Sequence, residues 1–277
     1  MKLSILMPAY NYPEGIKSIL LKTQILKHEN RSSYEIIIFD NSFNDRVYNL
    51  YKIYKTSLNI YYKKIPRSVG AVNNWNFLLK QCSGNFIYMI HHDDLPEQNN
   101  FFRDLIKRVQ KYKDYDIFIY NCRLKSKHFI LNRPNFSFYF KKIIINYFPK
   151  YLLRRNVIGS ISNIVFRNKN IFFNKKLQWL VDVDFYYRLI KNSNKIIFFK
   201  KDNIISSYQY AKSISRSLIK KKNKYLKETN FLKKYDSYKF LNFYQNFFIG
   251  TLESLIWYSI AIPFRLFYII ANLINIK

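Results

Sequence analysis

Four consecutive polar residues follow an apolar segment typical of a buried β-strand, in the order His91, His92, Asp93 and Asp94. Adjacent carboxylates repel each other unless a cation lies between them, and Mg²⁺ and Mn²⁺ take oxygen ligands of this kind, usually together with substrate phosphates. The neighbouring imidazoles also suit a transition metal. The structural alternative is a turn whose aspartate caps a helix starting near Glu97. The pattern therefore indicates either a metal site or a helix cap.

Two other expected strands end in polar or turn-forming residues. The first runs into Pro8, Ala9, Tyr10 and Asn11, and the second runs into Asp40. Ligands of open α/β sheets bind beyond the carboxyl ends of the strands, although Asp, Asn and Pro are also ordinary turn residues. No GxGxxG motif follows the first strand and no GxxxxGK[ST] motif occurs, so the dinucleotide fingerprint and the P-loop are both excluded. A nucleotide that binds at this edge would therefore be held by residues outside these two motifs.

The elements that must position these residues alternate along the first 120 residues. Apolar segments of strand length lie at 3–7, 35–39, 59–63, 85–90 and 116–120. Segments with helical period lie between them, at 13–28, 44–56, 70–82 and 97–113. Strands that alternate with crossover helices predict an α/β fold with a doubly wound, Rossmann-like, mainly parallel sheet.

The alternation stops after residue 121. A basic and aromatic region without a clear period covers 122–156, and the next ordered block contains a strand at 161–166, a helix at 182–192 and a strand at 195–199. A Lys-rich helical stretch and an apolar tail complete the chain, at 217–246 and 247–277. We therefore expect one domain over 1–216, with halves at 1–121 and 122–216, and an appended segment over 217–277.

Composition excludes several classes of protein. The 277 residues are 49% hydrophobic, enough for a packed core, and the two cysteines cannot form a disulfide framework or a four-cysteine zinc site. The apolar run before Pro8 is too short for an export signal, so a cytoplasmic protein is expected. The 47 basic and 17 acidic residues give a net charge of +30. This charge suits an anionic membrane surface or a nucleic acid.

The apolar tail has one charged residue between Ser254 and Ile276, which is Arg265. Its length could span a bilayer, but an arginine near the middle costs about 2.5–3.5 kcal/mol, and Pro263 favours a kink. We therefore predict one or two helices that lie in the membrane surface, with a buried core helix as the alternative. The lysines before the tail would face anionic headgroups.

Five segments, in this order, resemble the glycosyltransferase family 2 pattern of the GT-A fold, of the type that builds bacterial cell-surface polysaccharide. They are SILMPAYN, EIIIFDNS, RSVGAVNNWNFLLKQCSGNFIYMIHHDD, GSISNIVFR and WLVDVDFYYRL, and they fall within residues 2–215. Three of the five glycines, Gly70, Gly84 and Gly159, fall at motif positions. Because glycine is scarce here, each one is expected to meet a backbone requirement.

The resemblance implies roles for the residues at the strand ends. The nucleotide-binding residues would be Pro8, Ala9, Tyr10 and Asn11 around base and ribose, Asp40 on the base, commonly uracil, and Arg67, Gly70, Asn74 and Asp93 against the rest of the donor. Asp93 and Asp94 would hold Mn²⁺ or Mg²⁺ on the sugar diphosphate. The chain departs from the family in two places: histidine precedes the metal aspartates, and Tyr208 and Tyr210 replace the Arg and His of a closing motif.

The resemblance also implies that Asp182 is the catalytic general base. A carboxylate suits the deprotonation of an acceptor hydroxyl. The alternative from spacing is that Asp182 caps its helix, and that Asp184 and Arg188 form an ordinary surface pair. Trp179 and Asp184 are candidate acceptor-site residues, although a core aromatic is the commoner interpretation of Trp179.

The activity implied is that of an inverting, metal-dependent hexosyltransferase. It would move a sugar from a nucleotide-diphosphate donor, a UDP-sugar by preference, to a saccharide acceptor, expected to be lipid-linked, for lipopolysaccharide or capsule. The implied location is the cytoplasmic face of the inner or plasma membrane, as a peripheral or monotopic protein. The alternatives are a basic nucleic-acid-binding protein and an inactive GT-A scaffold at the membrane. No nucleic acid is expected as partner, because the aromatics lie mostly inside strands and helices and no nucleic-acid motif occurs.

Overall fold

The apolar segments of the sequence form one large sheet in the computed structural model, which describes residues 1–65, 69–125, 130–131, 137–153, 155–207, 227–232 and 255. The strands are β1 Leu3–Ala9, β2 Tyr34–Asp40, β3 Ile60–Lys64, β4 Phe86–Met89, β5 Asp94–Pro96, β6 Ile117–Lys125, β7 Ile130–Leu131, β8 Ile164–Arg167 and β9 Ile196–Ser207. The α-helices are α1 Pro13–Thr23, α2 Arg46–Tyr54, α3 Ala71–Gln81, α4 Phe101–Lys111, α5 Phe138–Tyr147 and α6 Val181–Lys191.

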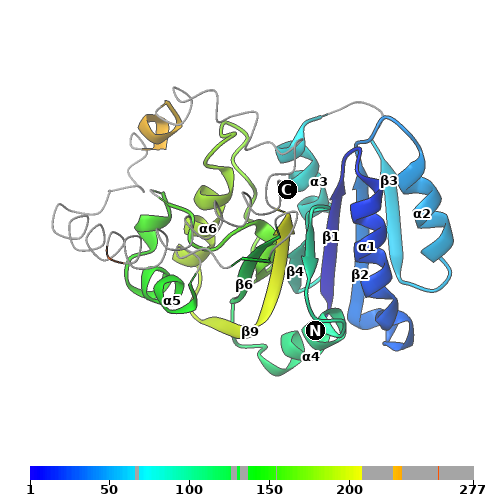
Figure 1. Ribbon diagram of the computed structural model, residues 1–277, viewed down its shortest axis with the longest axis horizontal. Coiled ribbons are helices and arrows are strands. Elements are labelled where there is room, and N and C mark those ends of the chain that lie inside the picture. The colour runs from blue at the N-terminus through cyan, green and yellow to red at the C-terminus, as the bar shows by residue number, and fades with distance from the viewer. Residues whose placement is uncertain are drawn as a thin grey trace, which may run out of the picture.

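The sheet has the order β3-β2-β1-β4-β8-β6-β9-β5, and β7 pairs with β6. Strands β1 to β4 are parallel, β8 runs antiparallel between β4 and β6, and β9 is parallel to β6. The carboxyl ends of β1, β2 and β4 therefore meet at one edge of the sheet. Figure 1 shows β1, β2 and β3 with α1 and α2 on one side of the view and α5 and α6 on the other. The expectation of a mainly parallel, doubly wound α/β sheet is confirmed.

Both faces of the sheet are covered by helices because its strands alternate their side chains between two cores. In β1, Leu3, Ile5 and Met7 face the core that α1, α2 and α4 complete. Leu6 faces the opposite core, to which α3, α5 and α6 contribute. All four side chains have no exposed surface. The central strands are therefore buried on both faces, which explains why they are apolar throughout.

Helix α5 occupies part of the 122–156 region, for which the sequence showed no clear period. Its outer face carries Tyr139, Ile143 and Tyr147, which are 65%, 40% and 73% exposed. On its buried face, Lys141 is 1% exposed and donates to the carbonyl oxygens of Tyr120 and Ile158. Burial lowers the pKa of Lys141 to about 8. An amphipathic helix is recognised in a sequence by apolar residues on one face and polar residues on the other. Helix α5 has apolar residues on its exposed face and a lysine on its buried face, so its sequence does not show this pattern.

Several boundaries also differ from the sequence prediction. Helix α4 begins at Phe101 instead of 97, the strand expected from 161 begins at Ile164 after a 3₁₀ turn, and β5 at Asp94–Pro96 was not expected. Strand β9 continues beyond 199 to Ser207 because an irregularity in its pairing with β6 lets it resume and pair with β5 as well. These short or interrupted pairings depend on partners far away in sequence, which local patterns do not report.

Only a small part of the appended segment 217–277 falls within the described residues. Its 227–232 portion is helical and packs against the α3, α5 and α6 core, where Leu232 is 2% exposed and Phe231 is partly buried. Arg265 and Pro263 lie outside the described residues, as does most of the predicted membrane-surface tail. Within the part of the chain that the structure describes, no helix combines the length and apolar character needed to cross a membrane.

Candidate functional site

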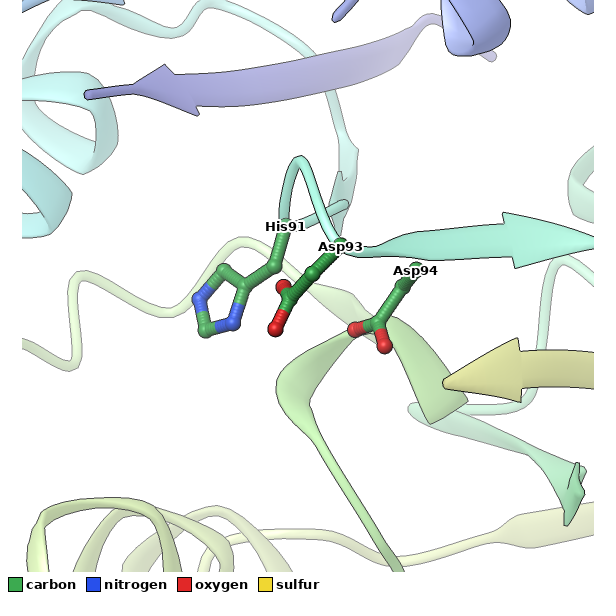
Figure 2. Close-up of side chains that lie close together, drawn as sticks. All are labelled: His91, Asp93 and Asp94. Atoms are coloured by element: carbon green, nitrogen blue, oxygen red, sulfur yellow. The ribbon is translucent and has the colours of Figure 1, made fainter. Parts of the chain in front are cut away.

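The loop that joins β4 to β5 and the first residue of β5 carry the candidate metal ligands. His91, Asp93 and Asp94 each offer one ligand atom, and these atoms lie within 4.8 Å of one another. Figure 2 shows the three side chains projecting from the same side of the loop. An imidazole and two carboxylates at this spacing match the donors that bind divalent metal ions. The cluster lies where β4 ends, at the carboxyl edge of the parallel strands.

Asp94, the first residue of β5, is held in place by two serines from the turn before β8. The side-chain hydroxyls of Ser160 and Ser162 both donate to Oδ2 of Asp94, at 2.6 Å each, and the His91 backbone N–H donates to Oγ of Ser162 at 2.9 Å. Asp94 is 3% exposed, and burial, followed by the charge of Asp93, raises its pKa despite these hydrogen bonds. A buried carboxylate of this kind favours a nearby cation.

Neither aspartate of the loop caps a helix. Helix α4 begins at Phe101, so Asn100 holds its N-cap position, and Asp94 belongs to β5, where it pairs with Ser206 of β9. The cap near Glu97, which the sequence left as the alternative to a metal site, is therefore wrong.

The ring of His91 stacks on Trp75 of α3, with centroids 4.9 Å apart and planes at 27°. Trp75 in turn packs edge-on against Phe173. The Nε2 atom of His91 is buried and has no hydrogen-bond partner among the described residues. An aromatic support on one face and an unpartnered ring nitrogen suit a metal ligand or a hydrogen bond to a bound molecule.

His92 is not part of the cluster of candidate ligands. Its ring packs edge-on against Tyr12 at 5.5 Å, and burial lowers its pKa. The carbonyl oxygen of His92 lies so close to Gly15 of α1 that a Cβ atom at Gly15 would be 1.8 Å from it. Only glycine permits this approach of helix to loop.

Asp182 is the second residue of α6 and is partly buried. Its Oδ1 atom is buried without a hydrogen-bond partner in the described part of the chain, and it makes no capping bond at the start of α6. Burial raises the pKa of Asp182, the nearby Asp94 raises it further, and His91 opposes both. The fold therefore brings Asp182 within electrostatic range of the β4–β5 loop, although the two are far apart in sequence.

Asp184 and Trp179, the candidate acceptor-site residues, lie close to Asp182 in the sequence but have different surroundings. Asp184 accepts hydrogen bonds from Nε and Nη2 of Arg188 at 3.0 and 2.7 Å. The i,i+4 pair is confirmed, but Asp184 is 1% exposed, so the expectation of an ordinary surface pair is wrong. Trp179, just before the helix, is 36% exposed. Acceptor roles for Trp179 and Asp184 stay predictions.

The ends of β1 and β2 are joined by hydrogen bonds from their loops. Pro8 and Ala9 belong to β1 itself and are buried. Asn11, at a positive φ of 49°, donates from its backbone N–H to Oγ of Ser42 and accepts from the backbone N–H of Phe43. Tyr10 is 45% exposed and lies edge-on to Phe43, which is 79% exposed. This edge therefore presents two aromatic rings to solvent.

Asp40, expected to contact the base, is completely buried and already accepts several hydrogen bonds. The donors are the backbone N–H of Ser42 and the hydroxyl of Tyr62, each at 2.8 Å, and Nζ of Lys64 at 3.3 Å. Burial and the adjacent Asp40 raise the pKa of Tyr62. In this structure Asp40 ties the end of β2 to β3.

The remaining predicted nucleotide residues lie near the start of α3 or outside the described chain. Gly70 holds the N-cap position of α3 with φ 80°, and Asn74 is 3% exposed and donates to the carbonyl oxygen of Phe39. Arg67, Tyr208 and Tyr210 lie outside the described residues.

Sequence reasoning missed the residues that support the site. Ser160, Ser162 and Trp75 hold Asp94 and His91, and Phe43 accompanies Tyr10. The serines were visible in the GSIS motif, two residues apart on either side of Ile161. Gly159 reaches φ 110°, and a Cβ atom there would meet Oδ1 of Asn163 at 2.5 Å. The scarce glycine therefore marks the turn that supplies the serines.

Comparison with known proteins agrees with this arrangement. The family model for glycosyl transferase family 2 matches residues 4–222. The fold is similar to Staphylococcus aureus TarS 1–349 in complex with UDP-GlcNAc, with a TM-score of 0.60 and 17% identity over 78% of this chain and 61% of that one. It is also similar to the mannosyltransferase PcManGT from Pyrobaculum calidifontis in complex with GDP-Man and Mn²⁺, with a TM-score of 0.53 and 13% identity over 74% of this chain and 56% of that one.

The chain thus spans less than two thirds of the length of these structures. Comparison with curated proteins gave no match. Because the family model covers most of the chain and its motifs form one edge of a GT-A sheet, the chain belongs to glycosyl transferase family 2.

Proposed function

We propose that this protein transfers a sugar from a nucleotide-diphosphate donor, a UDP-sugar by preference, to a saccharide acceptor with inversion at the anomeric carbon. The observation that carries the proposal is the cluster of His91, Asp93 and Asp94 where β4 ends, with Asp182 at the start of α6 within electrostatic range of His91 and Asp94. Family membership supports the reaction class. The donors bound by the similar structures, UDP-GlcNAc and GDP-Man, support a nucleotide sugar.

A divalent cation fits the residues of the β4–β5 loop. The ligand atoms of His91, Asp93 and Asp94 lie within 4.8 Å of one another, and burial makes the charge of Asp94 costly without a counterion. Mn²⁺ or Mg²⁺ would neutralise the leaving diphosphate when bound there. PcManGT was solved with Mn²⁺, which supports the same ion class here.

Asp182 would act as the general base. It would take the proton from the acceptor hydroxyl as that oxygen bonds to the anomeric carbon, while the bond from this carbon to the diphosphate breaks and its electron pair leaves with the nucleotide. Direct displacement with one base inverts the configuration. Its raised pKa makes its carboxylate a stronger base than that of an ordinary aspartate.

We further propose a lipid-linked acceptor, a role in surface polysaccharide synthesis and a place at the cytoplasmic face of the membrane. The net charge of +30 supports attraction to anionic headgroups. Deletion after residue 247 should move the protein from the membrane pellet to the soluble fraction. Continued pelleting would show that the tail is not the anchor.

The test of the reaction is a screen of UDP- and GDP-sugars with Mn²⁺, scored by release of free nucleotide. Asp182→Asn should lower release by about 10²- to 10⁴-fold while nucleotide binding is kept. Asp104→Asn on α4, which packs in the core opposite that of α6, makes the same chemical change as a control and should match the wild type. If Asp182→Asn releases nucleotide at the wild-type rate, Asp182 is not the base.

Two outcomes would support other functions. No release from any donor, with intact nucleotide binding, would indicate an inactive scaffold. Salt-dependent binding to random DNA duplexes that is tighter than binding to anionic vesicles would indicate a nucleic-acid-binding protein. Many of the aromatic rings in the described residues are buried in the two cores, which argues against base stacking on them.

A further inference from the structure

The backbone immediately before α6 is bound by a carboxylate from a later segment of the chain. The backbone N–H of Gln178 donates to Oε1 of Glu228, and those of Trp179 and Leu180 donate to Oε2, each at 2.9 Å. Three consecutive amides that converge on one anion form the kind of concave site that binds phosphate or carboxylate groups. Here the chain fills that site with its own side chain, 48 to 50 residues away in sequence.

The segment that carries Glu228 is anchored by residues that follow it. Glu228 is 6% exposed and Leu232, one turn further on, is 2% exposed in the core shared with α6. Phe231 packs against the same core, and Nζ of Lys176 lies 5.7 Å from the centre of its ring. The carboxylate therefore reaches the amides from a docked helix (orange in Figure 1). Such a buried, charge-assisted contact is stronger than an exposed hydrogen bond.

The amides that Glu228 binds belong to the residues leading directly into Asp182. Leu180 holds the N-cap position of α6 and has no side-chain group to cap the helix, so the start of α6 has no cap from its own N-cap residue. A negative charge near a helix N-terminus is also favoured by the helix dipole. Fixing 178–180 fixes the direction in which α6 begins, and with it the place of Asp182, two residues later.

We propose that Glu228 is a positioning residue for sugar transfer, which holds the 178–180 turn so that Asp182 and Trp179 face the reacting groups. The inference rests on the proposed function, because it gives Asp182 the role of base. It makes the segment Lys227 to Leu232 a part of the active site's support. Misplacing a catalytic group by about 1 Å costs up to 10²-fold in rate.

The test compares Glu228→Ala with Asn230→Ala in the full-length protein. Asn230 is exposed on the same short helix and serves as the matched control. Hydrogen exchange should become faster at the amides of 178–180 in Glu228→Ala, with the strands β1 to β4 unchanged. The kcat for transfer should fall roughly 10- to 100-fold, while the KM for the donor stays near that of the wild type.

Chemical rescue separates positioning from a general loss of structure. Formate is small enough to enter the space left by the Glu228 side chain and offers the same two oxygens to the three amides. It should restore part of the kcat of Glu228→Ala and have no effect on the wild type or on Asn230→Ala. Glu228→Gln, which keeps the shape and loses the charge, should fall between the wild type and Glu228→Ala.

Three results would overturn the proposal. Unchanged exchange at 178–180 in Glu228→Ala would mean that the contact does not form in solution. Faster exchange with an unchanged kcat would mean that the contact does not position the catalytic residues, and so would a lowered kcat that formate fails to raise. If the wild type transfers no sugar from any donor, the proposed function has failed instead, and the exchange experiment still decides whether Glu228 holds the turn.

Discussion

Two carboxylates at the amino edge of the sheet and two at the carboxyl edge have pKa values shifted in opposite directions. At the amino edge, where β2 and β6 begin, burial opposes the charged forms of Glu35 and Asp116, but hydrogen bonds outweigh it and the pKa of each is lowered. Glu35 accepts from Lys2, Ser4 and Ser83. Asp116 accepts from Arg167, Lys169 and the backbone N–H of Asn194.

At the carboxyl edge, burial raises the pKa of both Asp94 and Asp182. Neither takes part in an ion pair among the described residues. The chain has 47 Lys and Arg residues, so a shortage of cations does not explain the difference. The two carboxylates at the amino edge stabilise the fold, and Asp40 at the carboxyl edge likewise pairs with Lys64. Asp94 and Asp182 have no such ion pair in the part of the chain that the structure describes, and we therefore expect them to meet the charges that arrive with metal and substrate.

The largest effect that tests this contrast is expected for Asp94→Asn. Removing a metal-binding carboxylate should lower Mn²⁺-dependent transfer at least about 100-fold, because metal neutralisation of the leaving group contributes several kcal/mol. In metal-free protein the melting temperature should stay the same or rise, since a buried charge is replaced by a neutral group of the same shape. Activity assays and thermal melts with and without Mn²⁺ measure both effects.

The decisive control is the increase in melting temperature that Mn²⁺ produces. The wild type should show it and Asp94→Asn should lose it, because a ligand that binds only the folded state stabilises that state. A metal-free Asp94→Asn protein that melts well below the wild type would mean that Asp94 stabilises the fold as Asp116 does. The contrast between the two edges would then be absent.

The sequence predicted the layout of both edges better than the contacts within them. Apolar runs bounded by turn residues located β1 to β4, and the family pattern linked Asp182 to the loop at 91–94. The hydrogen bonds from Ser160 and Ser162 to Asp94 join residues 66 and 68 positions apart. Such contacts depend on how strands order themselves in the sheet, which hydrophobic periodicity does not report.

A second limit is that one residue can satisfy two different requirements. Asp40 matched the family position for a base contact, which stays a prediction, and in the structure its carboxylate also joins β2 to Tyr62 and Lys64. Lysine is usually a surface residue, but Lys141 occupies a core position. Residue type and spacing identify candidates, but burial and partners decide what each side chain does.

A medium effect is expected where the fold supports the carboxyl edge sterically. A Cβ atom at Gly15 would lie 1.8 Å from the carbonyl oxygen of His92, so Gly15→Ala must push α1 and the β4–β5 loop apart. Overpacking of this kind costs about 1–3 kcal/mol. Chemical denaturation should show this loss, and transfer should fall further because the metal ligands move with the loop.

Ser18→Ala is the matched control for this variant, because Ser18 lies exposed on the same helix. Its free energy of unfolding should stay within about 0.5 kcal/mol of the wild type. If Gly15→Ala is as stable and active as Ser18→Ala, the loop is not held against α1, and the carboxyl edge is less rigid than the structure indicates.

The smallest effect is expected at the amino edge, where Asp116→Asn should cost about 1–2 kcal/mol of stability at neutral pH through lost charge-assisted hydrogen bonds. Transfer by the folded protein should be unchanged, because Asp116 lies at the edge opposite the metal ligands. The pH dependence gives the sharper measurement. Because its pKa is lowered in the folded state, Asp116 contributes fully above the ordinary aspartate value of about 3.9, and the contribution is lost as the pH falls below it.

The contribution of Asp94 to stability should change with pH in the opposite direction. Its folded pKa is raised, so the folded state binds the proton more tightly than the unfolded state, and the cost of its charge disappears as the pH falls. The stability deficit of Asp116→Asn should therefore shrink on acidification, and so should any stability advantage of metal-free Asp94→Asn. Denaturation of both variants from pH 7 to pH 3 tests this. If Asp94→Asn is instead less stable than the wild type at pH 7, and this deficit shrinks on acidification as that of Asp116→Asn does, the two edges hold these carboxylates in the same way.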